Sequence, residues 1–179
     1  ESVETFKKLS NVATVSPKIY YHLKKKTNKI WWIGLRILKN YFKFQKTGGV
    51  YRKIEDKGQF KGFIETDSFC GCCTMFSSKI FKKIKKLDDD FFFGPEDIEA
   101  SFRLKKYGKL IVNLNSVTYH KVSQSIYVSG IKSRVYFETV VWLLLIKKIC
   151  NKSDKLQGYA FFILRAVNKL IKVVFKKDK

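Results

Sequence analysis

The feature that most constrains the fold of this chain is a change of hydrophobic pattern near residue 130. Before it, apolar residues occur in short runs bounded by polar or glycine-containing segments, as in Val12–Val15, Ile30–Ile33 and Leu110–Leu114. Such short runs are typical of buried strands. After it, two longer lysine-rich apolar segments, Tyr136–Ile149 and Leu156–Phe175, have the length and spacing of helices. We therefore expect an α/β fold over residues 1–130, followed by a helical, amphipathic segment over residues 131–179.

Local signals add detail to this expectation. A helix is expected over Glu1–Ser10. The strand Val12–Val15 is expected to end at Ser16-Pro17, and the chain is expected to be extended again over Lys18–Tyr21. Two strand-like stretches are expected later in the chain, Leu110–Leu114 and Val117–Tyr119. The weak pattern between residues 36 and 63 predicts a long loop or a hairpin.

Two further helices have start and stop signals. Ser77-Ser78 suits the N-cap of a short helix over Lys79–Ile84. Pro95 suits the first turn of another helix, and Gly108 is a typical residue after its end.

The chain is strongly basic, with 37 Lys and Arg against 15 Asp and Glu and a formal charge of +22. This charge favours a polyanionic partner such as nucleic acid, anionic lipid or a nucleotide diphosphate. The lysines are spread along the whole chain, so a generally solvated surface explains the charge equally well.

No signal peptide is recognised, and the apolar runs Val140–Ile146 and Tyr159–Leu164 are shorter than the ~20 residues of a membrane span. Three of the four cysteines lie within four positions, Cys70 to Cys73, which does not suggest a disulfide framework. A cytoplasmic location is expected, with the option of a peripheral position at the inner face of the cell membrane. Zinc binding by these cysteines is disfavoured because no second pair lies at metal-binding spacing, and we expect them to be small buried hydrophobes.

The richest chemistry lies in the stretch Asp88–Asp97. Glu96 and Asp97 are expected in the first turn of a helix, next to the aromatic cluster Phe91–Phe93. Aromatic packing desolvates a carboxylate and makes it more basic, whereas the helix N-terminus opposes that shift. Neighbouring helical residues point about 100° apart, so one carboxylate can face a cleft while the other is structural. For this pair alone, ordinary capping of a helix is the simpler explanation, and Asp88–Asp90 is expected to be a solvated turn.

The order of five motifs resembles the second half of family 2 glycosyltransferases, and the resemblance covers about residues 11–146. The motifs are Asn11–Tyr21, Thr66–Phe76, the helix Lys79–Ile84 with Leu87-Asp88, Phe91–Asp97 with Glu99, Arg103 and Tyr107-Gly108, and Val117–Ser125. The resemblance implies a partial GT-A-like mixed sheet with flanking helices. It also implies an inverting transfer of a sugar from a nucleotide-sugar donor to a glycan or lipid-linked acceptor.

The same resemblance implies roles for individual residues. Asp97 would be the base that deprotonates the acceptor hydroxyl, with Glu96 in support. His120 would ligate the divalent metal or touch the diphosphate. The residues on the acceptor and donor side would be Gly71, where the backbone passes close to acceptor and sugar, with Asp67, Gly94 and Arg103.

In this family the nucleotide-binding strands and an Asp-x-Asp motif precede the region matched here, and nothing before Asn11 supplies them. We therefore expect Mg²⁺ or Mn²⁺ to be bound mainly through that other half. We also expect residues 1–179 to be a piece of a longer protein and inactive alone.

Three other hypotheses stay open. A basic nucleic-acid-binding module fits the charge, but no nucleic-acid motif is recognised and most aromatics lie in core-like runs, so nucleic acid is disfavoured as a partner. A non-catalytic glycosyltransferase remnant is a second alternative. The segment Leu156–Lys179 has an apolar face surrounded by lysines, which suits either an anionic membrane surface or packing within the protein.

Overall fold

The computed structural model describes residues 1–38, 43–45, 54–91, 95–121 and 131–174. The elements, in chain order, are α1 (Ser2–Lys8), β1 (Val12–His22), β2 (Lys26–Trp32), β3 (Arg36–Leu38), β4 (Lys43–Gln45), β5 (Phe63–Glu65), β6 (Met75–Phe76), α3 (Ser78–Phe81), the 3-10 helix η2 (Lys82–Ile84), α4 (Glu96–Leu104), β7 (Lys109–His120), α5 (Ile131–Ile149) and α6 (Lys152–Val174).

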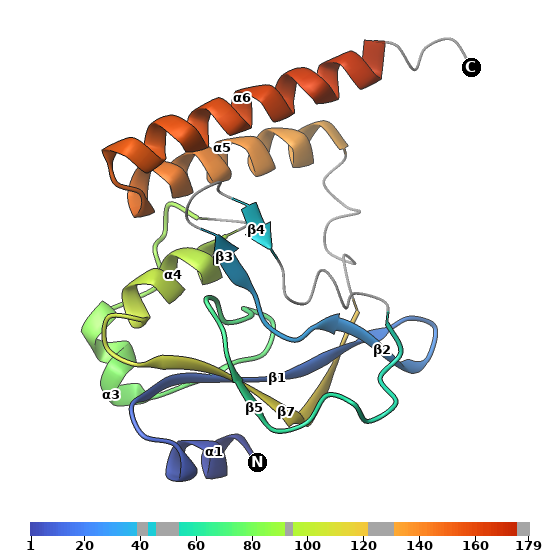
Figure 1. The fold of residues 1–179 in the computed structure, drawn as a ribbon, viewed down its shortest axis with the longest axis vertical. Coiled ribbons are helices and arrows are strands. Elements are labelled where there is room, and N and C mark those ends of the chain that lie inside the picture. The colour runs from blue at the N-terminus through green and yellow to red at the C-terminus, as the bar shows by residue number, and fades with distance from the viewer. Residues whose placement is uncertain (39–42, 46–53, 92–94, 122–130, 175–179) are drawn as a thin grey trace.

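The described strands form a five-stranded mixed sheet and a separate hairpin (Figure 1). β1 and β7 are its parallel central pair. β6 and β2 pair antiparallel with successive stretches of the other edge of β1, and β5 pairs antiparallel with β7. β3 and β4 form the hairpin, inside the segment where a loop or hairpin was predicted. The α/β class, a mixed sheet with flanking helices, is confirmed.

Both central strands are longer than predicted. β1 does not end at Ser16-Pro17 but continues to His22, and its register with β7 shifts between Pro17 and Lys18. Proline has no N–H to donate to a neighbouring strand, so within a sheet it is tolerated at an irregularity such as this one. β7 is one strand, not two, and the N–H of Asn115 donates to Oδ1 of Asn113 (3.0 Å) between the two predicted pieces.

Helices cover both faces of the central pair. One buried cluster joins the sheet to α1 and consists of Val12, Val15 and Ile111, with Phe6 and Leu9 packed against them. The other joins the sheet to η2 and α4 and consists of Ala13, Phe69, Ile84, Ala100, Leu104 and Leu110. Because side chains alternate along a strand, the continuous apolar runs of the sequence serve both faces.

The short helices begin close to their predicted positions. Ser77 is the N-cap of α3, although its side chain makes no capping hydrogen bond. Pro95 is the N-cap of α4, one residue before the first turn in which it was expected. Gly108 lies where a Cβ would come within 2.9 Å of the carbonyl oxygen of Asn11, so this position accepts only glycine without a shift of the backbone.

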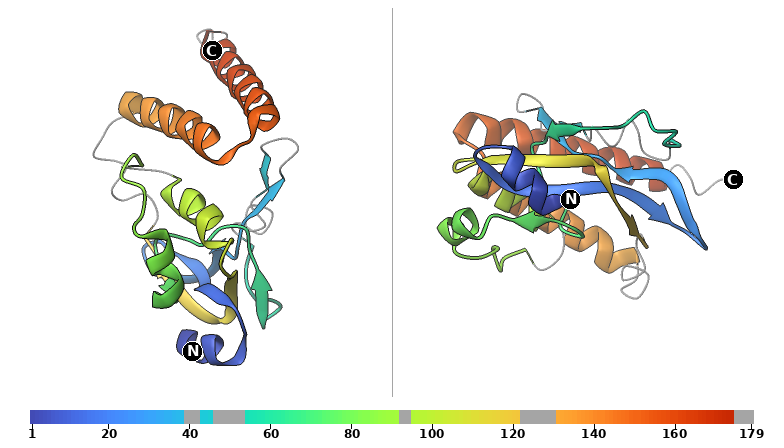
Figure 2. Two further views of the ribbon diagram at one scale, coloured as in Figure 1. Left: turned by 90° about the vertical axis from the view of Figure 1, so that its left-hand side faces the viewer. Right: turned by 90° about the horizontal axis from the view of Figure 1, so that it is seen from below.

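The two C-terminal helices form a layer at the end of the molecule opposite α1 (Figures 1 and 2). Their attachment is a buried cluster of Leu35, Phe91, Ile98, Val141 and Leu145. The turn Asp88–Asp90 contributes as well, since Lys148 of α5 binds the carboxylates of both Asp88 and Asp90. This turn, expected to be merely solvated, therefore also anchors α5. In the described part of the chain no helix is long and apolar enough to cross a bilayer.

Candidate functional site

The candidate site lies where the turn after β5 meets the first turn of α4. The Ser101 hydroxyl donates to the carbonyl oxygen of Asp97 (2.5 Å) and accepts the N–H of Phe69 (3.1 Å). Ser68 Oγ lies 3.2 Å from the same hydroxyl. All these groups are buried or partly buried, so Ser101 fixes the turn against the start of the helix.

This arrangement brings Gly71, Glu96 and Asp97 together. The N–H of Gly71 approaches Oδ2 of Asp97 (3.4 Å), and the N–H of Ile98 donates to Oδ1 (2.8 Å). A Cβ on Gly71 would lie 3.4 Å from Oε1 of Glu96 and 3.9 Å from Oδ2 of Asp97. Both carboxylates therefore lie beside the same glycine, and the division into one carboxylate that faces a cleft and one that is structural, which helix geometry allows, is not seen here.

The environment makes Asp97 unusually basic. Burial, followed by the negative charge of Glu96, raises the pKa of Asp97 from 3.8 to about 6, against the opposing effect of the N–H groups of Gly71 and Ile98. A carboxyl of this pKa is mostly ionised at pH 7, yet it binds a proton roughly 100-fold more tightly than an ordinary aspartate. A general base works best when its pKa lies near the operating pH.

Asp67 and Arg103 lie in separate networks within the protein. Burial alone would raise the pKa of Asp67, but the bound Lys105 and the N–H of Ile37 hold it below its ordinary value. Arg103 binds Glu99 (2.7 Å) and donates to the carbonyl oxygens of Ile84 and Lys86 (2.8 and 2.9 Å). The predicted site residue Gly94 lies outside the described residues.

His120 ends β7 and packs against Trp31 of β2, with 4.5 Å between the ring centroids. Burial lowers the pKa of His120, which favours the neutral imidazole that binds metals. Over the described ranges, no group of three or more His, Cys, Asp or Glu side chains is placed to hold a metal ion. Metal binding through His120 therefore stays a prediction.

The cysteine cluster differs from its prediction. Cys70 is buried, but Cys72 is exposed, so the expectation that all are buried hydrophobes is wrong for Cys72. The segment is a turn, which lets Cys72 be exposed while Cys70 is buried. The two sulfur atoms lie 3.4 Å apart across Gly71. Hydrogen bonding between these thiols, with burial of Cys70, raises the pKa of Cys70, and the same bond lowers that of Cys72.

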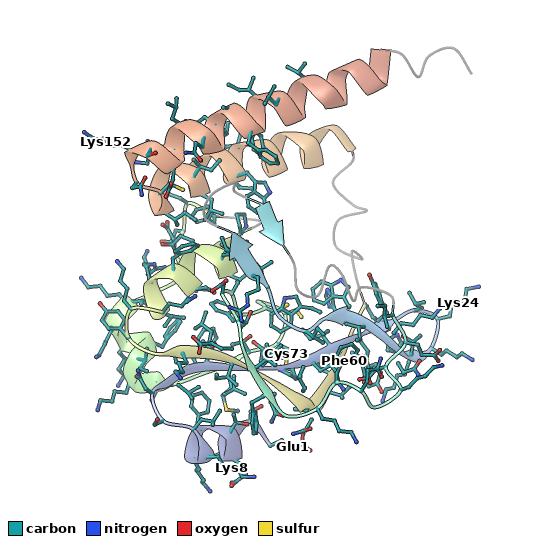
Figure 3. All side chains as sticks on the ribbon, viewed as in Figure 1. Glu1, Lys8, Lys24, Phe60, Cys73 and Lys152 are labelled. Carbon is teal, nitrogen blue, oxygen red and sulfur yellow. The ribbon has the colours of Figure 1, made fainter. Side chains whose placement is uncertain are left out.

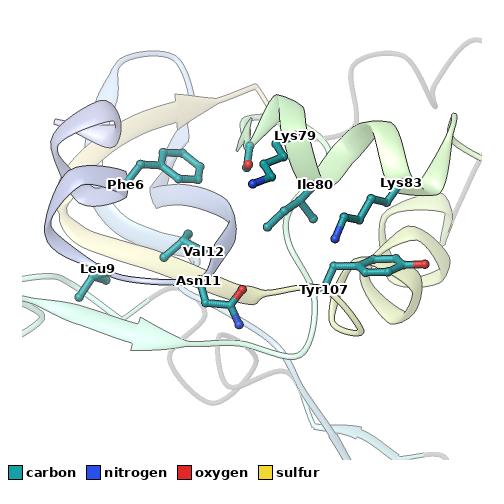
Figure 4. Close-up of a pocket in the computed structure, with 9 residues that line it drawn as sticks. Phe6, Leu9, Asn11, Val12, Lys79, Ile80, Lys83 and Tyr107 are labelled. Atoms are coloured by element: carbon teal, nitrogen blue, oxygen red, sulfur yellow. The ribbon is translucent and has the colours of Figure 1, made fainter.

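A pocket of about 370 Å³ that was not predicted from the sequence lies at the start of β1 (Figure 4). Its volume is at the lower end of those of ligand sites. Its lining residues are Phe6, Leu9, Asn11, Val12, Ser77, Lys79, Ile80, Lys83 and Tyr107. They come from α1, the start of β1, α3, η2 and the turn between α4 and β7, and none belongs to the Gly71–Glu96–Asp97 group. The i, i+4 spacing of Lys79 and Lys83 could be seen in the sequence. The pocket could not be predicted from it, because the other lining residues come from segments far apart along the chain.

A scan against protein-family models and a search of curated proteins found no match to this chain. Its function is therefore inferred from the chemistry of these residues and from the order of its motifs.

Proposed function

We propose that this chain is the acceptor-side part of an inverting, family 2-like glycosyltransferase in which Asp97 is the general base. The observation that carries the proposal is the pair of carboxylates facing Gly71, one of them with a pKa of about 6. A helix cap needs one carboxylate. A second carboxylate close to the first opposes the ionisation of both, so ordinary capping does not explain why Glu96 and Asp97 lie beside the same glycine.

In the proposed reaction, Asp97 accepts the proton of an acceptor hydroxyl. The hydroxyl oxygen forms a bond to the anomeric carbon of a nucleotide-activated sugar, from the face opposite the leaving group. The bond between that carbon and the phosphate oxygen breaks, and the nucleoside diphosphate leaves with the electron pair. Glu96 contributes by its charge, which keeps Asp97 basic.

Gly71 suits the acceptor side of this reaction. Gly71 is exposed and has no side chain, so this position does not block the approach of a ligand to either carboxylate. The donor, and the Mg²⁺ or Mn²⁺ that neutralises its diphosphate, would be bound mainly by the nucleotide-binding half of the catalytic unit, with His120 as the contact from this chain. Arg103 and Asp67 would position the acceptor side through the networks in which they lie.

The test compares variants of the full-length product of the encoding gene. Release of nucleoside diphosphate is measured with a panel of nucleotide-sugars in the presence of Mg²⁺ or Mn²⁺. Asp97→Asn is expected to lower kcat by about 10²–10⁴-fold, because the proton acceptor is lost. Asp89→Asn is the matched control, since Asp89 is an exposed aspartate paired with Lys86 at the surface, and it should leave kcat unchanged.

Glu96→Gln separates a base from a merely structural acid. Removing the charge of Glu96 lowers the pKa of Asp97, so the acidic limb of the kcat profile should move to lower pH. Full activity of Asp97→Asn would overturn the proposal. Absence of transfer by the wild-type full-length protein with every donor would instead favour a non-catalytic remnant.

A further inference from the structure

The outer face of α6 carries an apolar stripe that the described protein leaves uncovered. The stripe consists of Leu156, Ile163, Leu164 and Val167, whose exposed fractions are 75%, 62%, 63% and 45%. At about 100° per residue these four positions span only about 100° of the helix circumference. Four large aliphatic side chains exposed together on one side of a helix are a feature that folding of the chain does not explain.

The stripe lies on the side of α6 opposite α5. α6 packs against α5, and the residues on the side of α6 opposite the stripe are more buried: Gly158 is buried and Phe162 is half-buried. In Figure 3, side chains project from the outer side of α6, which begins at Lys152, away from α5. The exposed stripe is therefore additional to the surface that α6 uses within the protein.

The segment that carries the stripe is strongly cationic. Residues 131–179 contain twelve Lys and Arg against three Asp and Glu. Lys147 and Lys152 are exposed at the corner where α5 and α6 meet. An apolar stripe on a cationic segment is complementary to a surface that has an apolar interior and a negatively charged boundary.

We propose that α6 docks flat on an anionic membrane surface, with Leu156, Ile163, Leu164 and Val167 inserted at the boundary between headgroups and acyl chains. α6 has 23 residues, so it would lie along about 35 Å of the surface. It does not meet the requirements of a membrane span, which agrees with an interfacial position. This proposal does not depend on the proposed glycosyltransferase activity.

Two other occupants fit the stripe less well. A second copy of the chain would bring together two bodies of charge +22, which repel each other. Nucleic acid would be attracted by the charge, but bases stack on aromatic rings and the stripe is aliphatic. An acidic protein remains as a competing partner that the experiment distinguishes.

The test is sedimentation of the complete chain with vesicles at physiological ionic strength. One set contains equal parts of phosphatidylglycerol and phosphatidylcholine, and the other contains phosphatidylcholine alone. Leu156→Gln, Ile163→Gln and Leu164→Gln are combined, which leaves the net charge unchanged. The combined variant should bind the anionic vesicles at least about tenfold more weakly than wild type, because the inserted apolar area is lost. Leu23→Gln is the matched control, since Leu23 is equally exposed (61%) but lies in the turn between β1 and β2.

A second measurement uses variants that are expected to fold. Tryptophan is placed in the stripe by Ile163→Trp and in the control turn by Leu23→Trp. Acyl chains carrying bromine should quench the fluorescence added at position 163 and not that added at position 23. Circular dichroism checks that every variant keeps its helices.

Unchanged binding of the combined variant to anionic vesicles would mean that charge alone holds the protein there, and it would overturn the proposal. Equal binding of wild type to neutral vesicles would also overturn it. Self-association of wild type that the combined variant abolishes, without vesicle binding, would assign the stripe to a second copy. Binding of wild type to an acidic polypeptide but not to vesicles, lost in the combined variant, would assign it to a protein partner.

Discussion

Asp56 and Asp97 are two desolvated carboxylates whose surroundings have opposite effects. Asp56 binds the ammonium group of Lys18, the hydroxyl of Tyr20 (2.5 Å) and the N–H of Gly58 (2.7 Å). Among the described residues, the hydrogen-bond partners of the Asp97 carboxylate are backbone N–H groups, one of them at 3.4 Å, and the negative charge of Glu96 lies beside it. Neither environment is simply polar or apolar, so the partners decide the behaviour of each group.

The pKa values follow these partners. Burial alone would raise the pKa of Asp56, but Lys18, Tyr20 and Gly58 hold it below its ordinary value. At Asp97, burial and Glu96 act in the same direction and raise the pKa to about 6. The fold thus stabilises the ionised form of Asp56, as expected for a structural ion pair. It destabilises the ionised form of Asp97, as expected for a reactive group.

The largest effect is expected at Asp56. Asp56→Ala leaves the buried ammonium of Lys18 and the hydroxyl of Tyr20 without their shared acceptor, and the unfolding free energy should fall by about 3–5 kcal/mol. The measurement is urea-induced unfolding at pH 7. Asp89→Ala is the control, because Asp89 and Lys86 form an exposed pair and its loss should change stability by less than about 0.5 kcal/mol.

A double variant sharpens this prediction. Replacing both charges, with Lys18→Met and Asp56→Leu, removes the uncompensated ammonium and should recover most of the lost stability. If Asp56→Ala lowered the unfolding free energy no more than Asp89→Ala, Asp56 would not be part of a structural ion pair, and the contrast with Asp97 would be wrong.

At Asp97 the expected change in the unfolding free energy has the opposite sign. Asp97→Asn removes a carboxylate that the fold ionises at a cost, so this variant should be more stable than wild type by about 1–2 kcal/mol at pH 7. The full pKa shift would give about 3 kcal/mol, and the partial exposure of Asp97 reduces it. Urea-induced unfolding measures this gain, and a loss of stability would show that the carboxylate is a structural cap.

The pH dependence of that difference tests the cause. A raised pKa means that the folded state binds the proton more tightly, so the stabilisation is complete below about pH 4 and is lost as the pH rises through about 6. The advantage of Asp97→Asn over wild type should therefore grow between about pH 4 and 6 and stay constant above it. Subtracting the two unfolding curves cancels the contributions of other carboxylates, such as Asp56, that change in the opposite direction.

Local patterns predicted the elements well and their ends less well. The buried strand Leu110–Leu114 and the helix that starts after Pro95 were visible because hydrophobic spacing and caps act within a few residues. The continuation of β1 through Pro17 was not visible in the sequence. It depends on β7, which lies nearly a hundred residues further along the chain and pairs with β1 on both sides of an irregularity.

The same distinction applies to the two acidic sites. Glu96 and Asp97 stood out because their helix start is local, but their shared contact with Gly71 depends on how Ser101 holds two segments together. Asp56 was not predicted at all, since it lies in a segment of weak pattern and its partners Lys18 and Tyr20 are on β1. An alternation of Lys and Tyr on a buried strand is a signal that a distant carboxylate is needed, but it does not say which one.

Gly71→Ala is expected to have the smallest effect on stability and a clear effect on the proposed chemistry. The new methyl group would make ordinary contacts of 3.4–3.9 Å with Glu96 and Asp97, so stability should change by less than about 1 kcal/mol. It would nevertheless fill the space beside both carboxylates, and kcat/KM for the acceptor should fall in the full-length protein. Gly62→Ala is the converse control: Gly62 has a φ of +82° and open space around it, so alanine there should destabilise by about 1 kcal/mol and leave turnover unchanged. If Gly71→Ala were as active as wild type, an acceptor would not approach Asp97 past this glycine, and the difference between Asp97 and Asp56 would be one of electrostatics alone.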